Sequence, residues 1–285
     1  MNLKTFYKIY YRHRILKASV FLKIYLFFSI IIKYFLNLFF FPKKTNLDNL
    51  YFKKKFLTDK NLNFLFEYFN SDKGEKYYDQ YKQPYQQTKE IITAHGYAKY
   101  YEKYFSDIKN KKLNIIEIGS FYGHASAALF FYFKNAFICS ADINPDMYIY
   151  TSKRIKNFFL NSSSENSIKK NLIDKDITFD IIIEDASHML KDQIISLFML
   201  FKILNPGGYF IVEEIDFPEK RDDMRINQDL PDLKTILTKI NLNQDFKSRY
   251  ISEDEKKYFL SNFEKITFYN GNFNEFVIIK KKSIS

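Results

Sequence analysis

Two short clusters of carboxylates stand out in the sequence, and the first also contains a histidine. They are Glu184-Asp185-Ala186-Ser187-His188 and Glu213-Glu214-Ile215-Asp216. Each follows an apolar run, so both are expected at strand ends, on the ligand-binding edge of a parallel sheet. Carboxylates that converge there repel one another unless a cation neutralises them, and hard oxygen ligands favour Mg²⁺ or Ca²⁺. His188, three residues after Asp185, is suited to accept a proton near neutral pH.

A glycine-containing segment precedes both clusters. It reads Glu117-Ile118-Gly119-Ser120-Phe121-Tyr122-Gly123. Glycine at 119 and 123 allows a tight turn and close approach of the backbone to a ligand. Asp142 follows Gly123 by 19 residues, at the expected end of the next strand, and can accept hydrogen bonds from ribose hydroxyls. Dinucleotide-binding loops hold a pyrophosphate on G-x-G-x-x-G, whereas Glu117 beside this G-x-x-x-G segment would repel phosphate and suits a cationic ligand.

The elements that must position these residues alternate along the chain. Strands are expected at residues 113–118, 136–141, 179–183 and 209–212, with only a short one at 158–160, and helices at 124–134, 146–159, 192–204 and 233–240. A polar loop at 161–166, a turn at 206–208, a charged insertion at 217–232 and an antiparallel pair at 265–269 and 275–279 complete the expected body. This order predicts an α/β fold, a Rossmann-like doubly wound and mostly parallel sheet with a C-terminal antiparallel strand pair, plus an N-terminal apolar helix.

The net charge of the 285-residue chain, +11, is confined to one end. Residues 1–60 hold 13 Lys and Arg against two acids, and the remaining 225 residues hold 31 of each sign. The body is therefore not a basic nucleic-acid binder by charge, and no nucleic-acid partner is expected. A single cysteine, Cys139, excludes an intramolecular disulfide and disfavours a cysteine-built zinc site.

The basic N-terminal arm contains a long apolar stretch. From Ile15 to Phe41, 21 of 27 residues are apolar, and Pro42 follows as a stop signal. Three interpretations remain open: a helix lying in the membrane interface with snorkelling lysines, a transmembrane span, and an apolar helix packed on the body or on a second subunit, which would give a homo-oligomer. We expect residues 15–41 to contact a membrane surface.

The chain therefore divides into three predicted regions. Residues 1–44 form a basic and apolar membrane-associating arm, residues 45–110 a mostly helical lead-in and cofactor lid, and residues 111–285 the α/β domain. The lead-in contains a loop at Ser71-Asp72-Lys73-Gly74. Asp72, with Lys73, is expected either to cover the cofactor or to form a simple turn.

Residues 117–123 resemble motif I of class I S-adenosylmethionine (SAM) methyltransferases, E-x-G-x-G-x-G. Phe121 stands where that motif has its central glycine. The turn at 206–208 also resembles the one that follows the helix after strand four in that family. The resemblance implies SAM as the cofactor, with Glu117 facing its cationic end. The implied cofactor-binding residues are Glu117, Gly119, Ser120, Gly123, Asp142 and Asp72.

The acidic clusters make the resemblance more specific. D-x-x-H followed by an acidic pair is similar to the metal-dependent sugar O-methyltransferases of the macrocin and mycinamicin type, and to the cephalosporin hydroxylase/rhamnosyl O-methyltransferase group. Upstream, Asp72-Lys73-Gly74 and His95-Gly96-Tyr97 with Tyr100 and Tyr101 resemble the D-K-G…H-x-Y…Y stretch of such proteins. The resemblance covers about residues 70–216.

This resemblance implies roles for four residues. Asp185, Glu213 and Glu214 would hold the metal, and His188 would be the general base. The family usually has Glu-Asp at the acidic pair, so Glu214 departs from its pattern. Asp185 could instead contact the cofactor or cap a helix, His188 could be a structural helix-start residue, and one of the two glutamates could be solvated.

The implied function is SAM-dependent, Mg²⁺-assisted O-methylation of a sugar hydroxyl on a glycan, glycolipid or glycosylated metabolite. A cytoplasmic body held at the inner face of a membrane would meet lipid-linked saccharides. Two alternatives stay open: a metal-free methyltransferase acting on a small molecule or lipid, and a non-catalytic, membrane-anchored SAM-binding module.

Overall fold

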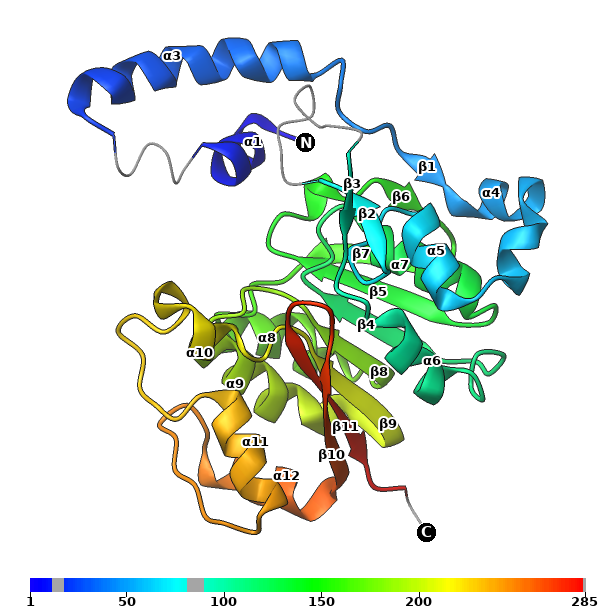
Figure 1. Cartoon of the computed structure of the whole chain (residues 1–285), viewed down its shortest axis with the longest axis vertical. Coiled ribbons are helices and arrows are strands. Elements are labelled where there is room, and N and C mark those ends of the chain that lie inside the picture. The colour runs from blue at the N-terminus through cyan, green and yellow to red at the C-terminus, as the bar shows by residue number, and fades with distance from the viewer. Residues whose placement is uncertain (12–17, 81–89, 284–285) are drawn as a thin grey trace.

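The computed structural model describes residues 1–11, 18–80 and 90–283. A seven-stranded sheet in the order β10-β11-β9-β8-β4-β5-β7 forms its centre (Figure 1). The strands are β4 (Asn114–Ile118), β5 (Phe137–Asp142), β7 (Ile155–Phe159), β8 (Phe179–Glu184), β9 (Leu204–Val212), β10 (Phe263–Asn270) and β11 (Glu275–Lys281). The strands from β9 to β7 are parallel, while β11 is antiparallel to both β9 and β10. The predicted fold class is confirmed.

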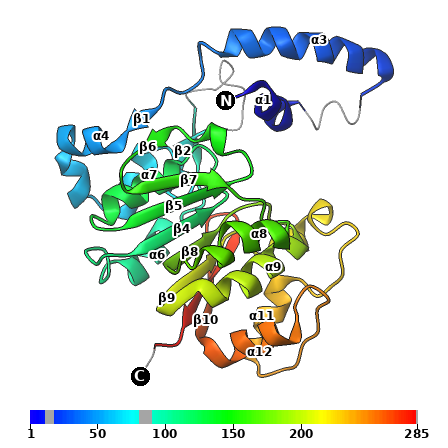
Figure 2. The same ribbon diagram turned by 180° about the vertical axis from the view of Figure 1, so that it is seen from behind.

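Helices cover both faces of this sheet because its strands are apolar on both sides. In β8, Ile181 and Ile183 pack into one core cluster and Ile182 into the other, as alternation along a strand requires. One face carries α4 (Leu47–Lys53), α5 (Leu62–Tyr68), α6 (Ala98–Phe105) and α7 (His124–Tyr132). The other carries α8 (Glu165–Asn171), α9 (Leu190–Leu200), α11 (Leu233–Asn241) and α12 (Glu253–Asn262). Both layers are visible in Figure 2.

The predicted helix at 146–159 is wrong. A 3₁₀ turn at Pro145–Met147 leads to β6 (Tyr150–Thr151), which pairs with β1 (Thr45–Asn46), and then to β7. The short strand expected at 158–160 is the end of β7. Strand β7 pairs in parallel with β5 from Ile138 to Asp142, so this segment satisfies backbone groups at the edge of the sheet. That long-range pairing outweighs the local pattern.

Smaller differences occur elsewhere. Helix α8 begins inside the predicted polar loop, because the Ser164 side chain caps it by accepting a hydrogen bond from the Ser167 amide. The predicted turn at 206–208 lies within β9. The charged insertion contains α10 (Phe217–Lys220). The lead-in holds an unpredicted antiparallel pair, β2 (Lys76–Tyr78) and β3 (Ile91–Thr93), as well as its helices, and α12 was not predicted.

Within its described residues, the N-terminal arm forms two helices, α1 (Leu3–Tyr10) and α3 (Val20–Asn37), which pack on each other (Figure 1). Among the described residues, α3 is the one helix long and apolar enough to cross a membrane, although only three of its residues are buried. Residues 15–17 of the predicted stretch lie outside the described residues. The arm touches the body through α1, where the Tyr10 and Tyr122 hydroxyls are 2.8 Å apart.

Candidate active site

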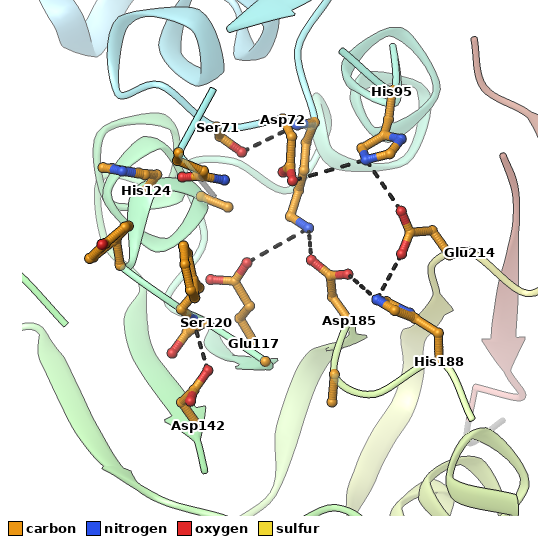
Figure 3. Close-up of a pocket in the computed structure, with 17 residues that line it drawn as sticks. Ser71, Asp72, His95, Glu117, Ser120, His124, Asp142, Asp185, His188 and Glu214 are labelled. Atoms are coloured by element: carbon orange, nitrogen blue, oxygen red, sulfur yellow. Dashed lines mark hydrogen bonds and ion pairs between the residues drawn. The ribbon is translucent and has the colours of Figure 1, made fainter. Parts of the chain in front are cut away.

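A cavity lies at the carboxyl ends of β4, β5, β8 and β9 (Figure 3). Eight of the ten residues predicted for the site line it: Asp72, Glu117, Gly119, Ser120, Asp142, Asp185, His188 and Glu214. The other two predicted residues, Gly123 and Glu213, are not among the residues that line this cavity. The topology therefore brings the glycine loop and both acidic clusters to one place, as parallel strands predict.

The loop after β4 depends on both of its glycines. Gly119 has φ +90°, and a Cβ atom there would lie 1.9 Å from the backbone oxygen of Asp185. At Gly123, with φ +84°, a Cβ atom would lie 2.2 Å from the Tyr148 ring. Phe121 also has positive φ, +46°, so the position where motif I carries its central glycine keeps a left-handed backbone. The close approach at Gly119 seats the cofactor loop directly on the end of β8.

Two acids flank this loop. Both oxygens of Asp142 accept backbone hydrogen bonds, from Phe121 N at 2.9 Å and Asn144 N at 2.7 Å. Burial raises the pKa of Asp142 above its ordinary value. Burial also raises the pKa of Glu117 to about 7, and Ser126 donates a hydrogen bond of 2.5 Å to this carboxylate. A cationic ligand beside Glu117 would favour its charged form.

A second, smaller cavity adjoins the first. The two share Gly119, Asp142 and Ala186, and the second is otherwise lined largely by apolar and hydroxyl side chains from residues 160–163. One elongated ligand can therefore extend past Asp142 from the acidic side to the more apolar side.

Asp185, His188 and Glu214 form the acidic centre of the main cavity. One ligand atom of each lies within 4.8 Å of the others, a grouping that could hold a metal ion. His188 Nε2 is 2.7 Å from Glu214 Oε2 and 3.7 Å from Asp185 Oδ1, and Figure 3 shows these three side chains facing one another. His188 and Glu214 both have left-handed backbones, with φ +55° and +53°. Such strain in residues without glycine's freedom is concentrated at functional sites.

The electrostatics of this centre couple the histidine to the glutamate. Burial by itself would lower the pKa of His188, but the Glu214 carboxylate raises it to about 9. Burial in turn opposes the charge of Glu214, yet the His188 imidazolium holds the pKa of Glu214 below its ordinary value. The pair is thus an imidazolium–carboxylate pair at neutral pH when nothing else is bound.

Glu213 points to a different partner from its neighbour. Its Oε2 lies 2.6 Å from the ammonium of Lys73, and the Tyr101 hydroxyl donates to its other oxygen. The Lys73 ammonium is also 2.5 Å from Asp185 Oδ2 and 3.8 Å from Glu117. Both carboxylate oxygens of Glu213, a predicted metal ligand, therefore already have partners. The other two predicted ligands, Asp185 and Glu214, lie close to each other beside His188.

The sequence did not predict these roles for Lys73 and Tyr101, although both lie in the upstream stretch that resembles the sugar methyltransferases. His95 belongs to the site too, with Nε2 3.3 Å from Glu214 Oε1. His124 lines the cavity, accompanied by the Tyr150 hydroxyl at 3.0 Å, and burial lowers its pKa to about 4. His124 is thus neutral at physiological pH.

Known proteins provide an independent comparison. No family model matches the sequence. The chain is 27% identical over 128 residues to 8-demethyl-8-alpha-L-rhamnosyl tetracenomycin-C 2'-O-methyltransferase of Streptomyces olivaceus, a match covering 42% of this chain and a third (33%) of that protein.

Solved structures match more of the chain. The MycE methyltransferase of mycinamycin biosynthesis with Mg and SAH superposes with a TM-score of 0.58 at 17% identity, over 79% of this chain and 54% of MycE. MycE with Mg, SAH and mycinamycin VI gives 0.57 at 17% identity, over 79% of this chain and 55% of MycE. The chain therefore shares the methyltransferase fold that its glycine loop predicted, while spanning little more than half of MycE's length.

Proposed function

We propose that this chain is a SAM-dependent O-methyltransferase that methylates a sugar hydroxyl of a glycan, glycolipid or glycosylated metabolite with the assistance of Mg²⁺. One observation carries the proposal: the acidic centre Asp185-His188-Glu214 and the cofactor loop line a single cavity, joined where Gly119 meets the Asp185 backbone. A proton acceptor and a candidate cation site thus lie beside the place for a methyl donor. The names of the similar proteins favour the same chemistry.

The cofactor is assigned by charge and shape. Glu117 suits the cationic methionine end of SAM. Each Asp142 oxygen accepts one backbone hydrogen bond and has a second lone pair for the ribose hydroxyls. The adjoining cavity can take the remainder of the nucleoside. Ser120, whose buried hydroxyl has no hydrogen-bond partner among the described residues, lines the main cavity. Gly123, which was predicted to bind the cofactor, lies outside the cavity lining, and its left-handed backbone shapes the loop.

The acidic centre fits a hard divalent cation. Asp185 and Glu214 offer carboxylate oxygens, and Mg²⁺ is commonly held by one or two carboxylates with water and substrate oxygens completing the shell. Bound there, Mg²⁺ would lower the pKa of a sugar hydroxyl and orient it. A cation on Glu214 also removes the cause of the raised His188 pKa, so burial would bring that pKa down.

His188 then acts as the general base. It accepts the proton of the sugar hydroxyl at a ring nitrogen while the hydroxyl oxygen forms a bond to the methyl carbon of SAM. The carbon–sulfur bond breaks, its electron pair remains on sulfur, and the products are a methyl ether and S-adenosylhomocysteine (SAH). The cavity holds the reacting atoms in line, which supplies the proximity that the reaction needs.

Calorimetric titration of the full chain with SAM, with and without Mg²⁺, tests this function directly. We expect SAM binding by the wild type, by Asp185→Asn and by His188→Gln, and loss of methyl transfer to a panel of saccharide acceptors in both variants. Asp180→Asn is the matched control. Asp180 lies in β8 at the end away from Asp185 and the cavity, and its side chain accepts a hydrogen bond of 2.7 Å from the Asn114 backbone amide. If SAM does not bind to the wild type, the proposal is wrong.

A metal-free methyltransferase is the second candidate, and Lys73 favours it. Its ammonium already compensates Asp185 and Glu213, so part of the acidic charge is neutralised without a metal. Chelation separates the two candidates. Transfer that survives EDTA would favour the metal-free enzyme, and transfer restored by Mg²⁺ would favour the assisted one.

We further propose that a cytoplasmic body is held at the inner face of a membrane through residues 15–41. Helix α3 and the residues that directly follow it expose many large apolar side chains, among them Phe21, which is 87% exposed, and Phe39, which is 90% exposed. Such a surface is typical of membrane or protein contacts. Flotation of the full chain with anionic vesicles should be lost in a Phe21→Ser/Phe39→Ser variant. Equal flotation of this variant and the wild type would refute the attachment.

A further inference from the structure

We propose that Lys73 is a resident cation that keeps Glu213 out of the metal site, so that the divalent ion is held by Asp185 and Glu214 without Glu213. The inference rests on the proposed metal-assisted function and defines its metal site. It assigns opposite roles to two adjacent glutamates that follow the same strand.

The first support is the position of the Lys73 ammonium. It lies within hydrogen-bond distance of Asp185 Oδ2, at 2.5 Å, and of Glu213 Oε2, at 2.6 Å. A divalent ion bridging Asp185 and Glu213 would have to occupy this space. Two cations cannot share it, because their repulsion is largest where water is excluded.

The second support is that the Lys73 ammonium is held among carboxylates in the protein interior. Its side chain is only 1% exposed, and Asp185, Glu213 and Glu117 surround it. Moving the ammonium away would leave it unpaired in the protein interior, which is strongly destabilising.

The third support is the contrast between the two glutamates. The Tyr101 hydroxyl and Lys73 occupy both oxygens of Glu213, whose side chain is 2% exposed and lies outside the cavity lining. Glu214 lines the cavity beside His188. An ion entering from solvent therefore reaches Glu214 and the Oδ1 side of Asp185, but not Glu213.

This arrangement has a chemical consequence. With two protein carboxylates instead of three, most coordination positions of a six-coordinate ion stay open to water and to oxygen atoms of the acceptor. The oxygen atoms of two vicinal sugar hydroxyls could fill such positions. By keeping Glu213 away from the ion, Lys73 would thus leave coordination positions for oxygen atoms of the acceptor. A site with three protein carboxylates would hold the ion more tightly but leave fewer such positions.

Metal titration of matched variants tests this inference without an activity assay. Mn²⁺ binding to the full chain in the presence of SAH is measured as the decrease of the electron paramagnetic resonance signal of free Mn²⁺. Glu214→Gln should weaken Mn²⁺ binding at least about tenfold, roughly the loss of 1.4 kcal/mol of binding free energy. Glu213→Gln, which preserves the hydrogen-bonding shape, should change it less than about threefold. Equal weakening by the two substitutions would overturn the proposal, and so would absence of Mn²⁺ binding to the wild type.

Lys73→Met provides the complementary test. Removing the ammonium should free Glu213 and tighten Mn²⁺ binding at least about tenfold, and adding Glu213→Gln should cancel the gain, as a double-mutant cycle requires. A gain that persists in the double variant would contradict the inference. SAM binding by the same preparations reports folding and tests the methyltransferase function separately. If Lys73→Met does not fold, the comparison of the two glutamate variants decides the question alone.

Discussion

The His188–Glu214 pair predicts a specific pH dependence of stability in the metal-free protein. The folded-state pKa of His188 is raised from 6.5 to about 9. A tenfold change in proton affinity between the folded and unfolded states corresponds to about 1.4 kcal/mol, so protonated His188 stabilises the fold by about 3 kcal/mol as an order of magnitude. Because the folded pKa is the higher one, this stabilisation is complete below pH 6.5 and is lost as the pH rises through about 9.

The perturbation is His188→Gln, and the assay is urea unfolding of the EDTA-treated full chain at several pH values between about 6 and 10. We expect the free energy of unfolding to differ between wild type and variant by about 3 kcal/mol more at the acidic end than at the alkaline end. His124→Gln is the control. Burial lowers the pKa of His124 to about 4, so its difference from wild type should stay constant above about pH 7.5 and change by no more than about 1 kcal/mol, in the opposite direction to that of His188, toward pH 6.

Parallel curves for wild type and His188→Gln would refute the coupling of His188 to Glu214. Added Mg²⁺ offers a second check. If Mg²⁺ occupies Glu214, the pKa of His188 falls, and the pH dependence attributed to His188 should shrink in the wild type.

Three further outcomes are expected. Gly119→Ala should abolish calorimetric SAM binding and lower the melting temperature, because the added Cβ would lie only 1.9 Å from a backbone oxygen. Gly74→Ala is its control and should bind SAM normally, since the atom nearest to its added Cβ is a side-chain atom at 3.2 Å. Asp142→Ala should weaken calorimetric SAM binding about tenfold or more, through loss of a charged acceptor; unchanged affinity would remove Asp142 from the cofactor site. Tyr10→Phe should destabilise the arm by about 1 kcal/mol in hydrogen exchange, since it leaves the Tyr122 hydroxyl buried without its 2.8 Å partner.

The sequence predicted the buried strands well and the edge strand poorly. Ile181 to Ile183 are buried on both faces of the sheet, so their continuous apolar run is distinctive. Strand β7 lies at the edge and exposes Lys156 and Asn157, so its composition resembles that of a surface helix. Only its pairing with β5, formed across the intervening chain, makes it a strand.

Some residues of the candidate site could likewise be predicted from the sequence, and others could not. Asp185, His188 and Glu214 could be predicted to meet, because strand ends in a parallel sheet converge whatever the details of packing. Lys73 could not, since its contacts with Asp185 and Glu213 span 112 and 140 residues of sequence. They depend on how the loop at 71–74 crosses the edge of the sheet, which no local pattern records.

The contact between α1 and the body has a consequence for how an acceptor would be found. Asn2 N and Thr5 Oγ1 bond to the two oxygens of Asp146, at 2.9 and 2.8 Å, close in sequence to Asp142. On the proposed attachment, the bilayer is therefore tethered beside the cofactor loop, and a lipid-linked saccharide diffuses in the same two-dimensional layer as the enzyme. Its effective concentration is set by its surface density rather than by the volume of the cell. Free sugars, which lack that tether, gain nothing from the arm.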